Sequence, residues 1–308
     1  MKPLFKTIAL LLAGAALTTG CERYEGFVHE PAFLHLDSMA VVNDPIHSIS
    51  NQDGFFTSEI DAVQIEVWFD GDARTTQLGS YALPCTVPIL DNRPIKKVQV
   101  YPFVKQNGIV STHIYYPYYT YGMSENLPLT TDSITNLGTK DPATGRWYYN
   151  VHYRNDIQVL KQEYFESQQY SIVFDSVVTW LKNTDRACTG NGCGLVHVNS
   201  TTEDTTFTIE GTMTLNQADA YLYLEMDYKT DVRLNVGMIS SRTIGTNKEM
   251  KGVETLYPTE NWQKIYINLG KTWKYFNYNP EFQLVFTAMN GEQIEGDVLL
   301  DNVKVVAY

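Results

Sequence analysis

Several features that identify common enzyme classes are missing from this sequence. Its six histidines never stand at His-x-x-x-His or His-Glu-x-x-His spacing, so a zinc hydrolase is unsupported. It contains no Gly-x-Ser-x-Gly nucleophile elbow, no P-loop and no dinucleotide-binding fingerprint. The 35 acidic residues offer too many carboxylate pairs for any one pair to indicate a glycosidase. We therefore expect a protein that is not an enzyme, and a hydrolase is the least favoured alternative.

Positive charge is also scarce. The 308 residues include 23 Lys and Arg against 35 Asp and Glu, which gives a net charge of −12 at pH 7. Binding of a phosphate backbone needs a basic face, so nucleic acid is excluded as a partner. Because 44% of the residues are hydrophobic and only 19% are charged, the chain can bury a core and is not disordered.

Long apolar runs are absent beyond the N-terminus. Residues 1–20 have a basic start and the apolar run Ile8–Leu17, which is too short to span the ~30 Å of a bilayer and is typical of an export signal. The small residues before Cys21 suit the lipoprotein peptidase, although Thr18 stands where a branched apolar residue is usual; ordinary signal cleavage is the alternative. We expect Cys21 to be the lipidated N-terminus, residues 21–30 to be a tether, and the acyl chains to anchor the protein to a membrane.

Cysteine is rare as well, with four residues in the whole chain. Cys188 and Cys193 flank a loop with two glycines, which can bring the thiols within disulfide reach, and an oxidising periplasm would keep that bond. Reduced thiols are the alternative, because a zinc site needs more ligands than this pair provides. Cys85 is expected to be buried and unreactive.

The most abundant signal in the sequence is the pattern of β-strands. Val63–Phe69 alternates apolar and polar residues, the chain turns at Asp70-Gly71-Asp72, and Leu78–Leu83 returns as the second strand of a hairpin. Short strands with turn signals between them predict an immunoglobulin-like β-sandwich or a related barrel in residues 31–155. Further strands are expected at Val98–Val104 and Ile109–Tyr116.

Residues 156–308 show the same pattern over seven or eight strands. Asp297–Val306 is almost continuously apolar, which predicts a strand buried on both faces. With no convincing helix between the strands, this part is expected to form a second β-sandwich, a jelly roll. The chain is thus predicted to be all-β. The other strands are expected at Tyr170–Trp180, Phe207–Leu215, Leu222–Asp227, Val232–Met238, Ile265–Leu269 and Phe282–Ala288.

Segments of both parts resemble one group of proteins. They are Ile60–Pro88, Asn107–Tyr119, Glu163–Glu166, Tyr221–Asp231, Trp262–Leu269 and Leu300–Val303. Together they are similar to uncharacterised two-domain outer-membrane lipoproteins of Bacteroidota, and the second part also resembles galactose-binding-like and carbohydrate-binding jelly rolls. The group has no agreed activity. The resemblance therefore implies an architecture and an outer-membrane location, on either the periplasmic or the cell-surface face.

The resemblance also implies one metal site. In many carbohydrate-binding jelly rolls a structural calcium ion joins the first and last strands through oxygen ligands. The similarity places Glu166 on the first strand and Asp301 on the last, so these two carboxylates are candidate calcium ligands. The alternative is that both are ordinary exposed or hydrogen-bonded acids and that the protein has no cofactor.

Aromatic residues gather in three segments, 115–121, 147–149 and 273–278. Sugar rings dock on exposed aromatic faces, so Trp273, Tyr275 and Tyr278 are candidate ligand-binding residues. Half-buried packing within the sheets and protein interfaces are the alternatives.

Two functions remain open. A non-catalytic accessory subunit of an envelope protein complex predicts a contiguous aromatic or apolar patch, which can span both domains. A glycan-binding lipoprotein for polysaccharide or nutrient capture predicts a groove with exposed rings beside Asn, Asp or Gln. No aromatic spacing here is distinctive of a sugar site, so the accessory subunit is favoured.

Overall fold

A computed structural model of the chain describes residues 30–308, apart from 43–56, 92, 169–176, 183–188, 201–203, 210–212, 216–220, 242–247, 280 and 290–294. Cys21 and Cys188 lie outside the described residues, as does most of the strand expected at Tyr170–Trp180. Lipidation and the disulfide therefore stay predictions. No helix in the described ranges is long and apolar enough to cross a membrane.

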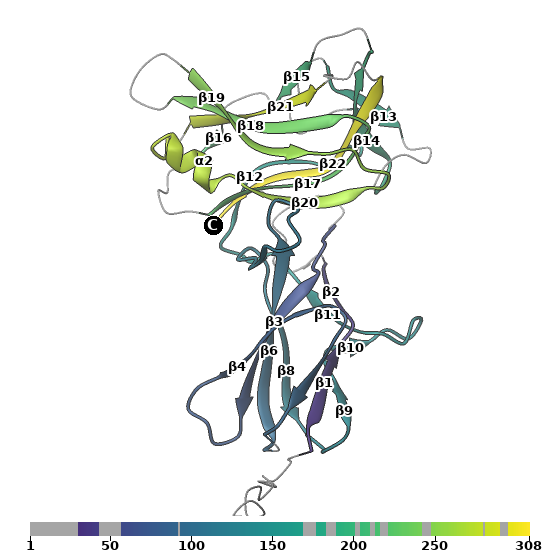
Figure 1. Cartoon of the computed structure of the whole chain (residues 1–308), viewed down its shortest axis with the longest axis vertical. Helices are drawn as coiled ribbons and strands as arrows, with labels where there is room; N and C mark the ends of the chain where they lie inside the picture. The colour runs from purple at the N-terminus through teal and green to yellow at the C-terminus, as the bar shows by residue number, and fades with distance from the viewer. Residues whose placement is uncertain are drawn as a thin grey trace, which may run out of the picture.

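The structure is almost entirely β, as predicted, and consists of two stacked sandwiches (Figure 1). Strands β1 to β11 form the N-terminal sandwich, and strands β12 to β22 form the C-terminal sandwich. Within the described part, the only backbone bridge between strands of the two sandwiches joins Gln106 to Tyr266. Side chains of the two sandwiches also form hydrogen bonds and pack against each other across the junction.

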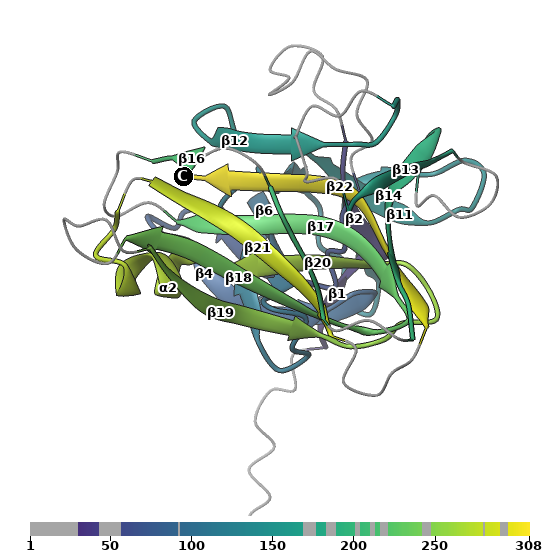
Figure 2. The ribbon, with the colours of Figure 1, turned by 90° about the horizontal axis from the view of Figure 1, so that it is seen from above.

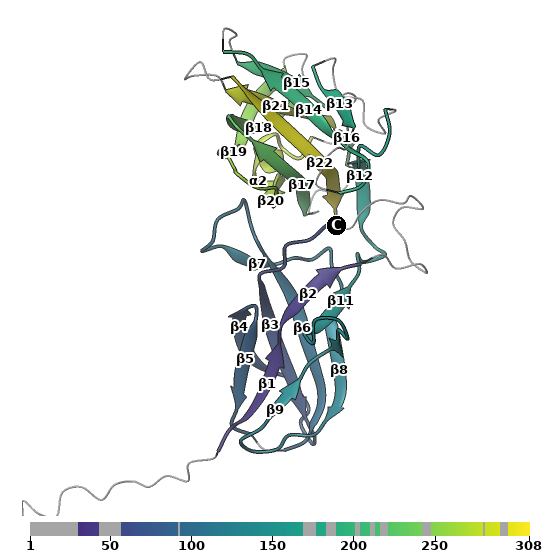
Figure 3. The same ribbon diagram turned by 90° about the vertical axis from the view of Figure 1, so that its right-hand side faces the viewer.

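Three small sheets build the N-terminal sandwich, in the orders β5-β1-β9, β10-β11-β2 and β4-β3-β6-β7, with β8 also paired to β6. Figure 3 shows them from the side, with β1 ending below β2. The strands are β1 (Ala32–Leu36), β2 (Ser38–Val41), β3 (Ala62–Phe69), β4 (Thr76–Ala82), β5 (Cys85–Ile89), β6 (Ile95–Lys105), β7 (His113–Tyr115), β8 (Gly122–Leu127), β9 (Ile134–Asn136), β10 (Thr139–Lys140) and β11 (Trp147–Val151).

The predicted hairpin is confirmed, because β3 and β4 pair antiparallel and the alternating residues of β3 are buried on one face. The strand expected at Ile109–Tyr116 is shorter than predicted and covers only β7. Asn107 and Gly108 have positive φ angles, and the Thr112 hydroxyl donates to the carbonyl groups of Gln106 and Ile109. These bonds make residues 107–112 a turn and delay the start of the strand.

Two sheets face each other in the C-terminal sandwich. The junction sheet, in the order β13-β14-β22-β17-β20 with β12 beside β22, lies next to the N-terminal sandwich. The outer sheet has the order β15-β21-β18-β19, with β16 also on β21. From above, strands of the outer sheet pass over β17 and β20 of the junction sheet (Figure 2).

Along each strand of this sandwich, successive side chains point alternately into the core and toward one of the two outward faces. The helix among the described residues, α2 (Gly270–Tyr275), closes one end of the core. The strands are β12 (Gln158–Glu163), β13 (Thr179–Lys182), β14 (Gly192–Val198), β15 (Thr205–Thr208), β16 (Met213–Thr214), β17 (Leu222–Thr230), β18 (Arg233–Ser241), β19 (Lys248–Leu256), β20 (Gln263–Asn268), β21 (Glu281–Met289) and β22 (Gly296–Ala307).

Strand β22 is buried on both faces, as predicted from its continuous apolar run. Val305 packs into the core between the two sheets, whereas Val306 faces the N-terminal sandwich. Tyr223 and Tyr266 of the junction sheet also belong to the hydrophobic core of the N-terminal sandwich. The outward face of the junction sheet thus completes a core that the N-terminal sandwich does not close by itself.

Candidate functional site

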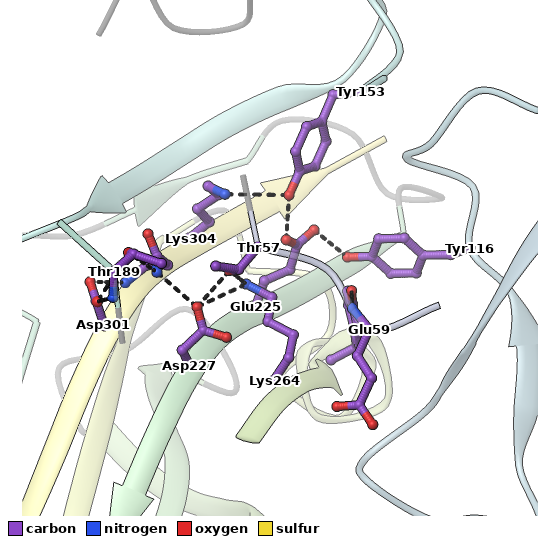
Figure 4. A network of polar contacts seen from close by, with 12 residues as sticks. Thr57, Glu59, Tyr116, Tyr153, Thr189, Glu225, Asp227, Lys264, Asp301 and Lys304 are labelled. Atoms are coloured by element: carbon purple, nitrogen blue, oxygen red, sulfur yellow. Dashed lines mark hydrogen bonds and ion pairs between the residues drawn. The ribbon is translucent and has the colours of Figure 1, made fainter. Parts of the chain in front are cut away.

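A buried polar network lies where the junction sheet meets the N-terminal sandwich (Figure 4). Leu224 and Met226 point into the core between the sheets, so strand alternation aims Glu225 the other way. Glu225 is fully buried, and its carboxylate accepts hydrogen bonds from the hydroxyl groups of Tyr116 (2.6 Å) and Tyr153 (2.5 Å). A buried carboxylate needs such partners. Glu225 therefore joins the two sandwiches.

Tyr116 remains a proton donor in this arrangement. Burial raises its pKa well above the usual value, and the negative charge of Glu225 raises it further. The same two causes, in the same order, raise the pKa of Tyr153. Both phenols therefore keep their protons at any physiological pH, so their titration does not break the two hydrogen bonds to Glu225.

Asp227 is the second buried carboxylate of the network. Its Oδ2 accepts hydrogen bonds from the hydroxyl of Thr57 (2.5 Å) and from Nδ2 of Asn302 (2.8 Å), and it lies 4.0 Å from Nζ of Lys264. Lys264 also donates to Thr57, at 3.1 Å. Thr57 comes from the N-terminal sandwich, so this group is a second tie across the junction.

Lys304 on β22 is buried in the same place, with Nζ 3.5 Å from the hydroxyl of Tyr153. Burial lowers the pKa of Lys304 to about 8, and the charge of Lys264 acts in the same direction. Glu225, Asp227 and the two lysines thus place opposite charges together out of contact with water. The arrangement is suited to joining surfaces, since each charge already has a partner.

A cavity of about 220 Å³ opens beside this network, between residues 105–110 and β20. Lys105 lies 2.8 Å from Asp61 and 3.3 Å from Glu59, all three of which line the cavity. The charged side chains that line the cavity therefore largely neutralise one another, and they leave no strong net charge to bind a charged ligand.

The candidate calcium ligands Glu166 and Asp301 bind the same short loop. Asp301 accepts hydrogen bonds from N of Thr189 (3.1 Å) and N of Asn302 (2.7 Å), and Glu166 accepts from N (3.1 Å) and Nδ2 (2.9 Å) of Asn191. These neighbours are hydrogen-bond donors, whereas calcium needs oxygen ligands. In the described part of the chain no three His, Cys, Asp or Glu side chains are placed to hold a metal ion. The geometry fits hydrogen-bonded acids better, and calcium stays a prediction.

The cysteines of the described part are both buried, Cys193 on β14 and Cys85 on β5. Since Cys188 lies outside the described residues, the Cys188–Cys193 disulfide is not tested. Burial raises the pKa of Cys85 to about 11, which agrees with the expected unreactive thiol.

The structure corrects the expectation for Trp273. Helix α2 turns this side chain into the core of the C-terminal sandwich, where it is 1% exposed, and its indole N–H donates to the carbonyl of Asn279. Its ring therefore has no face available to a sugar. Tyr278 packs edge-on against Trp273, and Tyr275 lies half-buried, with its hydroxyl donating to Glu249 and Lys251 over its ring. The three residues do not form an exposed platform.

A strip of exposed and half-buried tyrosines runs over the surface of both sandwiches, and we call it the tyrosine strip. Its exposed members are Tyr115, Tyr121 and Tyr221, and its half-buried members are Tyr101 and Tyr308. The ring of Tyr101 lies 5.8 Å from that of Tyr115 and 5.3 Å from that of Tyr121, which is 42% exposed. The strip has the contiguity that a protein-interaction function predicts. Only Tyr115 and Tyr121 fall in the aromatic segments that the sequence singled out.

Arg154 carries the strip across the junction. Its guanidinium lies 4.4 Å from the ring centroid of Tyr308 and donates to the hydroxyl of that residue, and it is also in hydrogen-bonding reach of Tyr115. Tyr221, which is 57% exposed, pairs through its backbone with Tyr308.

A depression of about 320 Å³ lies on the outward face of the outer sheet, and we call it the trough. Gly237 on β18 and Gly252 on β19 stand opposite each other in the ladder, so no side chain rises between the two strands at this point. Val285 on β21 pairs with Gly237 on its other side and contributes an apolar floor. The trough therefore lies where the paired residues of two neighbouring strands are both glycines.

A row of neutral polar side chains borders the trough. Thr206, Thr287, Asn235 and Thr255 stand side by side on four successive strands, which at ~4.8 Å per strand makes a row of about 14 Å. The Thr255 hydroxyl donates to Oδ1 of Asn235 at 2.7 Å, and the hydroxyls of Thr206 and Thr287 lie 3.3 Å apart. Asn235 is also held by a contact of its Nδ2 with Met289 Sδ at 2.9 Å. The row is therefore ordered.

One aromatic ring and two charges lie near this row. Tyr257 follows β19 and is 62% exposed, with the guanidinium of Arg233 at 5.5 Å from its ring centroid. Glu254 is among the residues that line the trough, and its carboxylate accepts a hydrogen bond from N of Thr255 at 3.1 Å. It pairs with the core residue Val236, so its side chain lies on the other face of the sheet from Asn235 and Thr255. The sequence gives no sign of this site, because Asn, Thr and Gly at alternate positions are ordinary for a solvent-facing strand.

Comparison with known proteins gives only distant structural similarities. No protein-family model matches the chain, and no curated protein matches it either. The chain is similar to the CBM22-1 xylan-binding domain of Paenibacillus barcinonensis Xyn10C, at 10% identity and a TM-score of 0.34 over 49% of this chain and 94% of that one. It is similar to a mutant of CBM29-2, a carbohydrate-binding module, complexed with mannohexaose, at 10% identity and a TM-score of 0.32 over 49% of this chain and 90% of that one. It is also similar to the enzymatically active domain of tailspike protein 4 of bacteriophage CBA120, at 12% identity and a TM-score of 0.31 over 44% of this chain and 17% of that one. Similarities this low carry no argument about function.

Proposed function

We propose that this chain is a non-catalytic glycan-binding protein, anchored to an outer membrane through a lipid on Cys21. The observation that carries the proposal is the trough of the outer sheet with its row of hydroxyl and amide groups. This choice reverses the order of the two functions that the sequence alone favoured.

The chemistry of the trough matches that of a sugar chain. Its volume of about 320 Å³ is at the lower end of the size of known ligand sites. Asn235, Thr255 and Thr287 can exchange hydrogen bonds with sugar hydroxyls, while Val285 offers an apolar surface to the C–H groups of a sugar ring. Tyr257 adds one exposed ring near the same row.

Catalysis is not part of the proposal. The two buried carboxylates closest in sequence, Glu225 and Asp227, face the N-terminal sandwich and are occupied by tyrosine, threonine and asparagine partners. Glu254 is the one acidic residue among those that line the trough, and its side chain lies on the core side of the sheet, whereas glycoside hydrolysis usually needs a pair of carboxylates.

Filling the trough tests the proposal. A Cβ atom added at Gly252 would meet no heavy atom within 4 Å, so Gly252→Leu should fold normally and occupy the trough. We expect the detergent-solubilised full chain to bind one or more members of a glycan array. Gly252→Leu should weaken that binding at least tenfold with an unchanged melting temperature. Thr76→Leu, at an exposed position of the N-terminal sandwich, is the matched control and should bind like the wild type.

A second candidate, the accessory subunit of an envelope complex, is favoured by the tyrosine strip. Exposed tyrosines next to an arginine are typical of protein interfaces. The same preparation separates the two functions. A blank array, together with a stoichiometric protein partner that the double variant Tyr115→Ser/Tyr121→Ser no longer retains, would replace the glycan-binding proposal with this one.

A further inference from the structure

We infer that Arg233 forms an anion subsite beside the polar row, so that the outward face of the outer sheet selects acidic glycans through the carboxylate of a uronic acid. This inference rests on the proposed function and names the class of ligand. It follows from the place of Arg233 in the sheet, from the lack of a carboxylate partner for its guanidinium and from the charges around it.

Arg233 lies on the same face of the outer sheet as the polar row. It precedes Asn235 by two residues on β18, so strand alternation points both side chains outward, ~6.8 Å apart along the strand. Tyr257 follows Thr255 by the same interval, just after the end of β19, and the guanidinium of Arg233 lies 5.5 Å from its ring centroid. Since Asn235 pairs with Thr255, the cation and the ring extend the row by one step along the strands.

The guanidinium of Arg233 is exposed and is not neutralised by a carboxylate. Within the described part of the chain no acidic side chain lies within 4 Å of it, whereas Arg93 and Arg154 each form ion pairs with aspartates. The ring of Tyr257 holds the guanidinium through a cation–π contact and brings no negative charge. The planar fork of N–H donors matches the two oxygens of a carboxylate, so Arg233 can bind one that comes from outside the chain.

Acidic side chains of the surrounding segments do not take this role. Glu254 lies on the core side of the sheet. The carboxylate of Asp231 accepts a hydrogen bond from N of Asp297, near the start of β22, at 3.0 Å. Asp204 precedes β15 and is separated from Arg233 by strand β21, which at ~4.8 Å per strand puts their backbones about 10 Å apart. The charge beside the polar row is therefore locally positive.

The net charge of the whole chain acts against a polyanion. At −12 it slows the approach of any acidic polymer. This effect is long-range, so salt at physiological strength screens most of it beyond ~8 Å, whereas an ion pair in contact is screened less. The preference for an acidic glycan should therefore be measured at ~0.15 M salt, where the contact with Arg233 outweighs the general repulsion.

Pairs of polysaccharides that differ only in charge test this inference. The probes are a mannan, a galactan and a glucan, each in its unmodified form and after oxidation of its C6 hydroxymethyl groups to carboxylates. Calorimetry with the detergent-solubilised full chain gives the ratio of affinities within each pair. For the polymer backbone that binds most tightly, we expect the oxidised form to bind at least about fivefold more tightly than the neutral form.

Two variants identify the charge responsible. Arg233→Gln should reduce the ratio to about twofold or less with an unchanged melting temperature, because the side chain is exposed and keeps most of its length. Arg74→Gln removes an exposed arginine of the N-terminal sandwich and is the matched control. It should keep the wild-type ratio.

The outcomes separate this inference from the function on which it rests. Three results would overturn selection by Arg233 and leave the glycan-binding function standing: a neutral form that binds as tightly as its oxidised form or more tightly, a preference for the oxidised form that survives in Arg233→Gln, or a preference that Arg74→Gln removes equally. If none of the six polymers and no member of the glycan array binds, the proposed function itself is wrong.

Discussion

The two outward faces of the C-terminal sandwich are built from the same kind of alternating strand but differ in chemistry. The junction face presents Glu225, Asp227 and Lys304, and each of these charges is buried. The outer face presents Asn235 and threonines around a pair of glycines, and the residues that line its trough include one ionisable residue, Glu254, whose side chain lies on the core side of the sheet. The first face is covered by protein, whereas the second is open to solvent over the trough.

The difference shows how a sheet face can be specialised for a permanent or an exchanging partner. A permanent partner can supply a matched group for every charge, and a buried charge that lacks its partner is costly, so the fit is selective. A face that binds and releases a ligand does better with small neutral groups, since these lose little when the ligand leaves and water returns.

The largest expected effect tests the permanent face. Glu225→Ala would remove the acceptor that the buried hydroxyl groups of Tyr116 and Tyr153 share, at a cost of ~1–3 kcal/mol for each lost hydrogen bond. We expect the free energy of unfolding, measured by urea denaturation, to fall by about 3 kcal/mol. Glu260→Ala, which removes an exposed carboxylate, should change it by less than ~0.5 kcal/mol. If Glu225→Ala lowers the free energy of unfolding by less than ~1 kcal/mol, the junction does not depend on the two hydrogen bonds to Glu225.

A smaller effect concerns pH at the edge of the network. Burial raises the pKa of Asp301 from 3.8 to about 7, so between these values the folded state keeps a proton that the unfolded state has lost. The free energy of unfolding should therefore fall as pH rises from about 4 to about 7.

Asp301→Asn cannot ionise and should remove this part of the pH dependence. Relative to the wild type, the variant should gain on the order of 2 kcal/mol between pH 4 and pH 7.5, a discounted share of the full shift. Urea titrations at several pH values measure it. Parallel stability curves for the two proteins would show that Asp301 stays ionised in the folded state.

The smallest expected effect lies on the exchanging face. Thr287→Val keeps the shape of the side chain and removes one hydroxyl from the row, so glycan binding should weaken about threefold, the worth of a modest hydrogen bond. Thr76→Val is the matched control on the N-terminal sandwich, and calorimetry on both variants makes the comparison. Unchanged affinity for Thr287→Val would place the ligand away from this row.

The sequence was sufficient to predict most strands, because alternation is a local property. It predicted the β3–β4 hairpin and the doubly buried β22. It could not predict the junction, since Glu225 and Asp227 look like ordinary solvent-facing positions of an alternating strand. Their burial depends on another part of the chain, and Tyr116 is more than a hundred residues away.

The trough was equally hidden. Gly237 and Gly252 come opposite each other only because of the register of β18 and β19, which shifts between Val236 and Gly237. No local pattern contains that shift. In the opposite direction, the aromatic segment around Trp273 was a strong local signal for a surface site, but one helical turn directs Trp273 into the core.

The shared core at the junction has a mechanical consequence. Because Tyr223, Tyr266 and Val306 complete the packing of the N-terminal sandwich, the two sandwiches should tilt together as one stiff post rather than bend at a hinge. Strand β1 begins at the end of this post that lies farthest from the outer sheet (Figures 1 and 3). A ligand bound on the outer sheet would thus stay at a constant distance from the surface to which the N-terminal end is attached.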